Sequence, residues 1–200
     1  MMKAMVKEIS RAKLPTKYGN FTVIAFQCES GSPEHAVLLH GDVAGQEGVP
    51  VRIHSECLTG DAFGSIKCDC GEQLSLSLKY IQSRPNGVLI YLRQEGRGIG
   101  FANKIKAYSL QDGGLDTVEA NEKLGFANDM RDYKDAAIIL VSLGVKSISL
   151  LTNNPKKISG LKAHGIIVRD RIPLEIKPNK ANRGYLEVKK KKLGHTLESV

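Results

Sequence analysis

The chain has 200 residues, of which 42% are hydrophobic and 25% are charged, and its formal net charge at pH 7 is +8. This composition is ordinary for a globular protein and excludes a disordered chain, and the length is sufficient to bury a core without disulfides. No apolar run approaches the roughly 18 residues of a membrane helix, and the N-terminus lacks the apolar segment of a signal peptide. We therefore expect a cytoplasmic protein without a membrane partner.

The first third of the chain alternates apolar and polar residues. The runs GNFTVIAFQC, EHAVLLHGDV and VPVRIHSE predict strands of a mainly antiparallel sheet. Cys28 ends the first of these runs, and we interpret it as a buried structural thiol rather than a metal ligand.

The rest of the chain alternates predicted helices with short apolar strands. Helices are predicted in GEQLSLSLKYIQSR, FANKIKAYSLQD, DTVEANEKLGF and YKDAAIILVSLG, and buried strands in GVLIYL and KSISLLT. A helix after NNPKK and a strand in HGIIVRDRIP complete a β-α-β pattern. The predicted fold class is α+β: a single compact domain over residues 1–200, with antiparallel N-terminal strands followed by a mixed sheet flanked by helices. The lysine run in YLEVKKKKLGH is typical of a solvated helix face.

Three of the four cysteines, Cys57, Cys68 and Cys70, lie close together in the sequence. In a reducing compartment clustered cysteines more often bind metal than form disulfides, and thiolates favour zinc. The pattern leaves two interpretations open: a catalytic site with water in the fourth position, or a structural site closed by His54 or a distant residue. An open site would support hydrolysis at an electrophilic carbon. The signature of the zinc nucleobase deaminases is absent, so a different zinc hydrolase is expected.

Two turns that follow predicted strands suit a polyphosphate. In RQEGRGIG (residues 93–100), glycines allow the backbone to approach a ligand, and Arg93 and Arg97 can pair with phosphate oxygens. In LLTNNPKK (residues 150–157), Asn154 can cap a helix that begins with proline, and the free amides and lysines suit an anion. The alternative for the second turn is an ordinary strand-to-helix connection with exposed lysines. Two such turns beside a zinc site favour a nucleotide.

Four segments, RIHSECLTGDAFGSIKCDCG, YLRQEGRGIG, LQDGGLDTVEANEKLGF and LLTNNPKK, together resemble GTP cyclohydrolase II, the zinc enzyme that opens riboflavin biosynthesis. The resemblance extends from AKLPTKYGNF to GYLEVKKKKLGH, and the length leads us to expect the free-standing enzyme rather than a fused form. It implies a homodimer with one Zn²⁺ per subunit and Mg²⁺ on the substrate phosphates. The implied reaction converts GTP to 2,5-diamino-6-ribosylamino-4(3H)-pyrimidinone 5′-phosphate and releases formate and pyrophosphate.

The resemblance also assigns functional residues. The implied zinc ligands are Cys57, Cys68 and Cys70. The implied GTP contacts are Arg52, Ile53, His54, Ser55, Glu56, Gln73, Glu95, Gly96, Arg97, Thr117, Thr152 and Lys157. The implied catalytic residues are Asp129 as general base, Arg131 as nucleophile and Tyr108 near the base. Met130 stands where relatives often carry an acidic residue.

The chemistry of arginine favours a different role for Arg131. A guanidinium stays protonated well above neutral pH and then has no free lone pair, so we expect Arg131 to clamp the α-phosphate electrostatically. Asp129 would orient Arg131 or accept a proton from water, and its alternative role is that of a helix N-cap.

Two other functions compete with this one. A zinc-stabilised nucleic-acid-binding module would use the basic tail and the two turns, but the chain has no tryptophan and lacks interleaved aromatic residues. We therefore expect GTP as a small-molecule substrate and no nucleic acid. A relative that retains the formyl group, or that binds GTP without turnover, is disfavoured by Tyr108, Arg131 and the three thiols.

Overall fold

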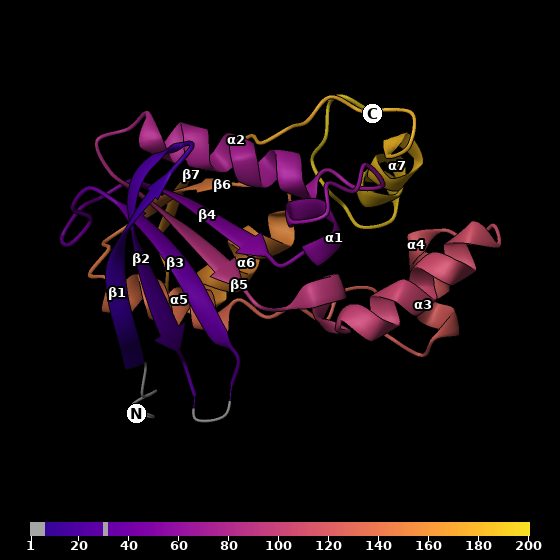
Figure 1. Cartoon of the computed structure of the whole chain (residues 1–200), viewed down its shortest axis with the longest axis horizontal. Coiled ribbons are helices and arrows are strands. Elements are labelled where there is room, and N and C mark those ends of the chain that lie inside the picture. Colours follow the sequence, from indigo (N-terminus) through magenta and orange to yellow (C-terminus); the bar gives the residue numbers. More distant parts are fainter. Residues whose placement is uncertain (1–6, 30–31) are drawn as a thin grey trace.

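A computed structural model describes residues 7–29 and 32–200, which are organised around a seven-stranded sheet of order β1-β2-β3-β5-β4-β6-β7 (Figure 1). The strands are β1 (Lys7–Thr16), β2 (Gly19–Gln27), β3 (Glu34–His40), β4 (Val49–Ser55), β5 (Gly87–Leu92), β6 (Ile148–Leu151) and β7 (Val168–Ile172). Neighbours from β1 to β5 in this order pair antiparallel, and those from β5 to β7 pair parallel. The mixed sheet confirms the predicted α+β class.

The helices of the structure include those predicted, and α2 to α5 begin and end close to the predicted boundaries, whereas α1 and η1 were not predicted. The helices are α1 (Leu58–Asp61), α2 (Cys70–Gln82), the 3₁₀ helix η1 (Glu95–Gly98), α3 (Phe101–Asp112), α4 (Thr117–Lys123), α5 (Lys134–Ser142), α6 (Pro155–Ala163) and α7 (Arg183–Lys191). As predicted, Asn154 caps α6, because its side chain accepts a hydrogen bond from the Lys156 amide and proline follows it. Asp116 caps α4 through a capping box with Glu119.

Two features of the N-terminal third differ from the prediction. The sequence predicts β4 in a mainly antiparallel sheet, but this strand pairs in parallel with both β5 and β6. Its run from Val51 to His54 is buried throughout, as expected for a parallel strand covered on both faces. Strand β1 was not predicted, because it lies at the edge of the sheet with mostly exposed residues and gives no apolar alternation.

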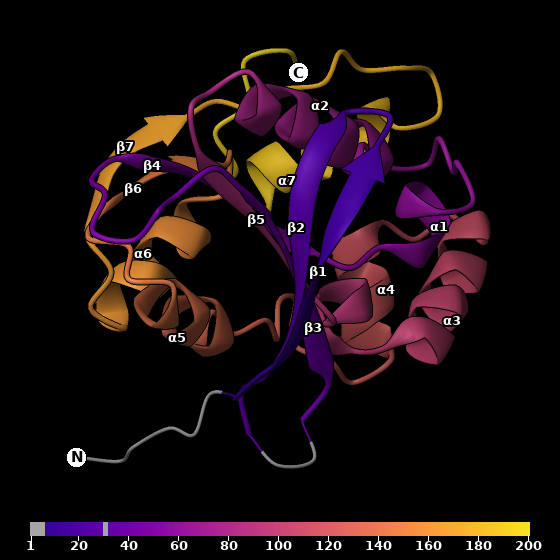
Figure 2. The ribbon, with the colours of Figure 1, turned by 60° about the vertical axis from the view of Figure 1, so that its left-hand side comes forward.

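Helices cover both faces of the sheet (Figure 2). On one face, Leu140 of α5 and Leu161 of α6 belong to the main buried cluster together with Ile53 and Ile90. On the other face, residues of α2 pack against β2 and β5 in a second cluster that contains Phe21, Leu78, Ile81 and Leu89. Helices α3, α4 and α7 lie beyond the carboxyl ends of β4 and β5 (Figure 1).

Cys28 is fully buried in the main cluster, as the interpretation of a structural thiol requires. His35 and Asp135 lie beside it. His35 Nε2 is 2.9 Å from an Asp135 oxygen, and the Arg93 amide donates to His35 Nδ1 at 3.2 Å. Because both ring nitrogens already have partners, a structural role explains this group without a metal.

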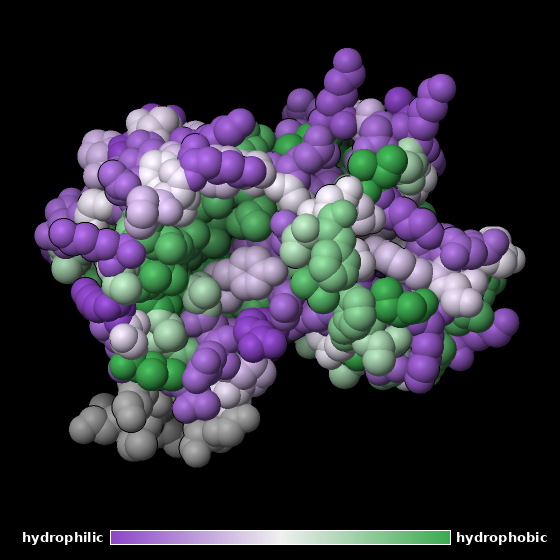
Figure 3. All heavy atoms as spheres, viewed as in Figure 1, coloured by the Kyte–Doolittle hydropathy of each residue, from purple (hydrophilic) through white to green (hydrophobic). Residues whose placement is uncertain are grey.

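The surface in Figure 3 is hydrophilic around much of its rim, and hydrophobic side chains gather in a hollow over the middle strands below α2. Within the parts of the chain that the structure describes, no helix is both long and apolar enough to cross a membrane.

Candidate active site

Three parallel strands end at one edge of the sheet and lead into the segments that the sequence singled out. Strand β4 ends at Ser55, shortly before Cys57; β5 ends before the glycine-rich turn; and β6 ends before Thr152. Because the carboxyl ends of neighbouring parallel strands meet at the same edge, these segments surround one pocket. It contains about 1000 Å³ of empty space, including the part open to solvent.

The pocket brings together most of the predicted site residues. They are Arg52, His54, Ser55, Glu56, Cys57, Cys68, Cys70, Gln73, Glu95, Gly96, Arg97, Tyr108, Thr117, Arg131, Thr152 and Lys157. Ile53 is not among them, because successive side chains of a strand point to opposite faces and that of Ile53 lies in the core. Asp129 does not line the pocket either, but it binds the side chain of Arg131, which does.

Other pocket residues were not singled out as ligand contacts. They are Ile99, Lys104, Ala107, Gln111, Asn121, Asn153, Asn154, Tyr185, Lys189 and His195. Lys104, Ala107 and Gln111 share one face of α3 with Tyr108, so helical spacing around Tyr108 was a signal that could have identified them. No sequence signal distinguishes the three residues from α7 and the segment after it.

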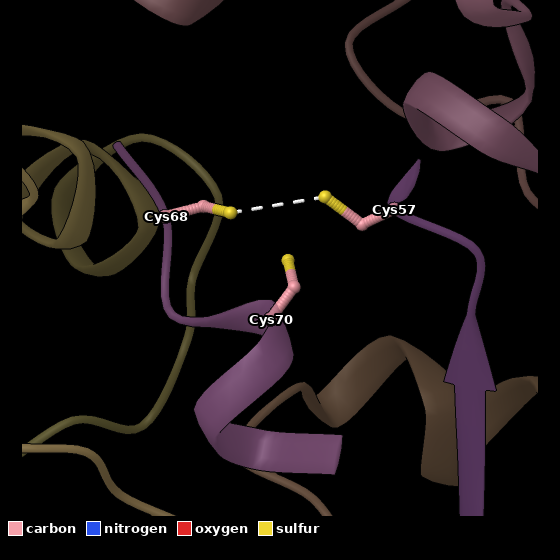
Figure 4. A group of neighbouring side chains, drawn as sticks. All are labelled: Cys57, Cys68 and Cys70. Carbon is pink, nitrogen blue, oxygen red and sulfur yellow. Dashed lines mark hydrogen bonds between the residues drawn. The ribbon is translucent and has the colours of Figure 1, made fainter. Parts of the chain in front are cut away.

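The thiols of Cys57, Cys68 and Cys70 point toward one another (Figure 4). The Sγ atoms of Cys57 and Cys68 are 3.7 Å apart, and all three sulfur atoms lie within 4.8 Å of one another. Zn–S bonds of about 2.3 Å in a tetrahedron place sulfur atoms about 3.8 Å apart, so the donor set fits zinc. Within residues 7–29 and 32–200, no fourth His, Cys, Asp or Glu atom joins this group.

Gly60 of α1 leaves the space that the thiols occupy. A Cβ atom at this position would lie 2.8 Å from the Cys68 sulfur and 3.3 Å from the Cys57 sulfur. A side chain here would therefore force the thiols to move.

Lys104 and Glu95 form a buried ion pair beside the thiols. Lys104 Nζ lies 2.8 Å from a Glu95 oxygen and 3.2 Å from the Cys57 sulfur. The other Glu95 oxygen accepts a hydrogen bond from the Leu58 amide at 2.7 Å. Hydrogen bonds from Cys68 and Cys70, and then Lys104, lower the pKa of the Cys57 thiol far below its usual value. The hydrogen bond to Cys57 is the main cause that raises the pKa of Cys68 to about 11.

His54 binds the carboxylate of Asp61. Its Nε2 atom is 3.0 Å from both Asp61 oxygens, and Asp61 also accepts hydrogen bonds from the Tyr91 hydroxyl at 2.8 Å and the Cys57 amide at 3.0 Å. Burial lowers the pKa of His54, which favours the neutral ring. The alternative of a structural site closed by His54 is disfavoured, because neither ring nitrogen of His54 lies within 4.8 Å of all three sulfur atoms.

A chain of hydrogen bonds connects residues 68–70, called the metal loop below, to α7. Arg52 donates to the side-chain oxygen Oε1 of Gln73 at 2.7 Å, and the side-chain nitrogen Nε2 of Gln73 donates to Asp69 at 2.6 Å. Lys189 Nζ donates to the other Asp69 oxygen at 2.8 Å. The prediction of a solvated lysine run is wrong for Lys189, which is only 8% exposed, whereas the lysines at 190–192 are exposed. Its position one turn after Tyr185 places it on the side of α7 that faces the pocket.

The side chains that line the pocket include more cations than carboxylates. Arg97 is in the left-handed region with φ of 61°, in a turn where Gly96 and Gly98 also have positive φ. Lys157 is 4% exposed and donates to the Ile53 carbonyl at 2.6 Å. Burial, followed by the charges of Arg52 and Arg131, lowers the pKa of Lys157 well below its usual value. An anion bound here would compensate these charges.

Among the residues that the structure describes, three polar atoms of the pocket are buried without a hydrogen-bond partner: Arg52 Nε, His54 Nδ1 and Asn154 Nδ2. Buried polar atoms usually have hydrogen-bond partners, so the part of the pocket around these three atoms suits a polar ligand.

The fold and pocket define a class of α+β protein in which a group of three thiols and several cationic side chains line one pocket at the carboxyl ends of parallel strands. Residues 7–173 match the family model described as GTP cyclohydrolase II, and the chain belongs to this family. The match confirms the resemblance seen in the sequence.

Relatives agree with the family assignment. The chain is 52% identical over 191 residues to GTP cyclohydrolase-2 of Picrophilus torridus, covering 96% of this chain and 99% of that one. It is 50% identical over 193 residues to riboflavin biosynthesis protein RibBA of Chlorobium phaeovibrioides, covering 96% of this chain and 47% of that protein. It is 54% identical over 185 residues to RibBA of Bacillus subtilis, covering 92% and 46%. The chain thus spans about half the length of these RibBA relatives.

Proposed function

We propose that the chain is a zinc-dependent hydrolase that converts GTP to 2,5-diamino-6-ribosylamino-4(3H)-pyrimidinone 5′-phosphate, formate and pyrophosphate, the first step of riboflavin biosynthesis. One observation carries the proposal: the three thiols and the cationic side chains face the same pocket. A purine ring and a polyphosphate could therefore occupy the pocket together. Membership of the GTP cyclohydrolase II family supports this choice of substrate.

The thiol end of the pocket would act on the guanine ring. Zinc held by Cys57, Cys68 and Cys70 would supply a Lewis acid that activates water for attack at guanine C8. The negative charges of three thiolates would weaken zinc as a Lewis acid. The positive charge of Lys104 Nζ, 3.2 Å from the Cys57 sulfur, would offset part of this effect. Asp61 fixes the start of this segment through the Cys57 amide.

Glu56, Gln73 and Tyr108 would have different roles around the base. Gln73 uses its amide oxygen and nitrogen within the protein, so it is suited to positioning Arg52. Glu56 lines the pocket, and the two oxygens of a carboxylate accept hydrogen bonds, which makes it the better candidate for binding the guanine N1–H and amino group. Burial raises the pKa of Tyr108 to about 12, so its hydroxyl stays protonated at neutral pH and can donate a hydrogen bond.

The cationic end would bind the triphosphate. Arg97 and Lys157 would neutralise charge that develops as the bond between the α- and β-phosphates breaks, together with Mg²⁺ on the phosphates. Asp129 holds Arg131 in place, and Arg131 would clamp the α-phosphate.

Incubation of the protein with GTP, zinc and magnesium tests this function. We expect formate and pyrophosphate in equal amounts and a changed ultraviolet spectrum. A formamide product without formate would indicate the truncated reaction, and binding without products would indicate a non-catalytic homologue. No turnover, combined with salt-dependent binding of nucleic acid, would favour the rival function.

We further propose that residues 1–200 form one GTP cyclohydrolase II-like domain that acts as a homodimer in the cytoplasm. Sedimentation of the protein with and without GTP measures the oligomeric state, and a monomer under both conditions would contradict the dimer.

A further inference from the structure

Helix α7 and the segment after it lie outside the residues that match the family model, which ends at residue 173. Nevertheless, Tyr185, Lys189 and His195 line the same pocket as the thiols and the predicted GTP contacts. In Figure 1 this part of the chain lies beside the start of α2, opposite α3.

The segment after α7 is attached to the turn that follows β6. The Thr196 amide donates to the Asn153 carbonyl at 2.9 Å, and the His195 amide donates to the Lys189 carbonyl at 3.0 Å. Leu197 is 6% exposed, so the end of the segment packs against the protein. These contacts place the tail next to Thr152, a predicted GTP contact.

The side chains of this segment lie among the cations of the pocket. The Tyr185 ring centroid is 5.8 Å from the Arg97 guanidinium and 5.1 Å from Lys189 Nζ. An ammonium group has three N–H donors, and Asp69 accepts one from Lys189, which leaves donors for a ligand. Within the described part of the chain, Arg97 and Lys157 form no ion pair with a carboxylate. The pocket therefore carries positive charge that an anion would balance.

His195 lies in the same charged surroundings. Burial, followed by the charges of Lys189, Arg131, Lys157 and Arg97, lowers the pKa of His195 to about 3. The ring is therefore neutral at pH 7, and because His195 lines the pocket, its one N–H group can donate a hydrogen bond to a phosphate oxygen.

We propose that residues 182–197 form a wall of the pocket that binds the polyphosphate of the substrate, with Lys189 and His195 as direct phosphate-binding residues. This proposal rests on the proposed function, because GTP supplies the polyphosphate. The Lys189–Asp69 ion pair also joins this wall to the metal loop, since Asp69 lies between Cys68 and Cys70. The wall thereby fixes the position of the thiol end of the pocket relative to its phosphate-binding end.

The test measures binding of inorganic tripolyphosphate, GTP and guanosine to the zinc-loaded full chain by calorimetry. We expect His195→Asn and Lys189→Met each to weaken tripolyphosphate and GTP binding by about tenfold, the scale of one charge-assisted hydrogen bond. Guanosine binding should stay within about twofold, because guanosine has no phosphate for these residues to contact. The matched control is Lys190→Met, a change of the exposed neighbouring lysine on the same helix.

A second measurement covers the case in which Lys189→Met unfolds because Asp69 loses its partner. Hydrogen exchange of the unchanged protein should slow in residues 183–197 when tripolyphosphate is added, and Lys189→Arg should restore part of the binding that Lys189→Met loses. Unchanged tripolyphosphate affinity in His195→Asn and Lys189→Met would overturn the proposal. Equal loss of guanosine and tripolyphosphate binding would also overturn it, because that pattern indicates a structural role.

The two proposals fail in different ways. Formate release by the unchanged protein, with full tripolyphosphate affinity in both variants, would leave the proposed function intact and exclude this wall. Tripolyphosphate binding that depends on both residues, in a protein that releases no formate, would exclude the function and support the wall.

Discussion

The carboxylate of Asp129 holds the guanidinium of Arg131 through two parallel hydrogen bonds, 2.7 Å from Nε to Oδ1 and 2.6 Å from Nη2 to Oδ2. The side chain of Arg131 is 12% exposed and that of Asp129 is 10% exposed. Burial alone would lower the pKa of Arg131, but the hydrogen bonds with Asp129 raise it above its usual value. A guanidinium that is fixed and more firmly protonated is suited to stabilising phosphate charge and poorly suited to nucleophilic attack.

Replacing Arg131 should therefore slow pyrophosphate release, because the positive charge that stabilises the phosphates is lost. Arg131→Met should lower kcat for pyrophosphate release by about 10²- to 10³-fold, and Arg131→Lys should lose less because it keeps the positive charge. The intact mass of the protein after rapid quenching with GTP should show no guanylyl adduct. An adduct that is present in the unchanged protein and absent in Arg131→Met would establish the nucleophile and contradict the clamp.

Substitution of Gly60 should weaken metal binding. Gly60→Ala would place a methyl group 2.8 Å from the Cys68 sulfur, so one thiol must leave its position. We expect zinc affinity to fall by about tenfold or more, which is the effect of removing a residue that holds a metal ligand in place. Competition with a chromophoric chelator measures this affinity. Gly184→Ala is the control, because a Cβ there meets no atom within 4 Å. Equal zinc affinity in both variants would show that the thiols do not depend on this space.

His195 should make the protein less stable in mild acid. Unfolded, this histidine binds a proton below its usual pKa of 6.5, whereas in the folded protein it stays neutral until about pH 3. The unfolded state therefore binds more protons as the pH falls from 6.5 toward 3, and the free energy of unfolding decreases through this window.

Denaturant unfolding at several pH values between 7 and 4 measures this effect. The free energy of unfolding should fall more steeply with decreasing pH in the unchanged protein than in His195→Asn. Metal release in acid affects both proteins, so the comparison isolates the histidine. Parallel curves would mean that the ring is not held neutral in the fold.

Local patterns predicted much of the secondary structure. The apolar run of β5 and the residues of α3 match the observed boundaries, because a continuous apolar strand and a glycine-bounded helix are visible in the sequence itself. The direction of β4 could not be seen in this way. It depends on pairing Val51 with Val88 and Leu150, which are distant along the chain.

The same distinction applies to the pocket. The Cys57, Cys68 and Cys70 group was recognisable because the three cysteines lie within fourteen residues, with Cys57 just before α1 and Cys70 at the start of α2. Lys189 was not recognisable, since nothing in a run of four lysines tells which one reaches Asp69 when α7 packs. The packing also shows that the Ile53 side chain lies in the core, so the GTP contact predicted there stays a prediction for its backbone alone.

Formate release as a function of zinc content is the most direct test of a zinc site that opens into a GTP pocket. Zinc and formate should be measured together for the unchanged protein, for Cys68→Ser, and for Cys28→Ser as a control thiol buried away from the pocket. We predict that the unchanged protein and Cys28→Ser hold one zinc per chain and release formate, and that Cys68→Ser loses both. Full formate release by Cys68→Ser, or by the unchanged protein after its zinc has been removed, would contradict this mechanism.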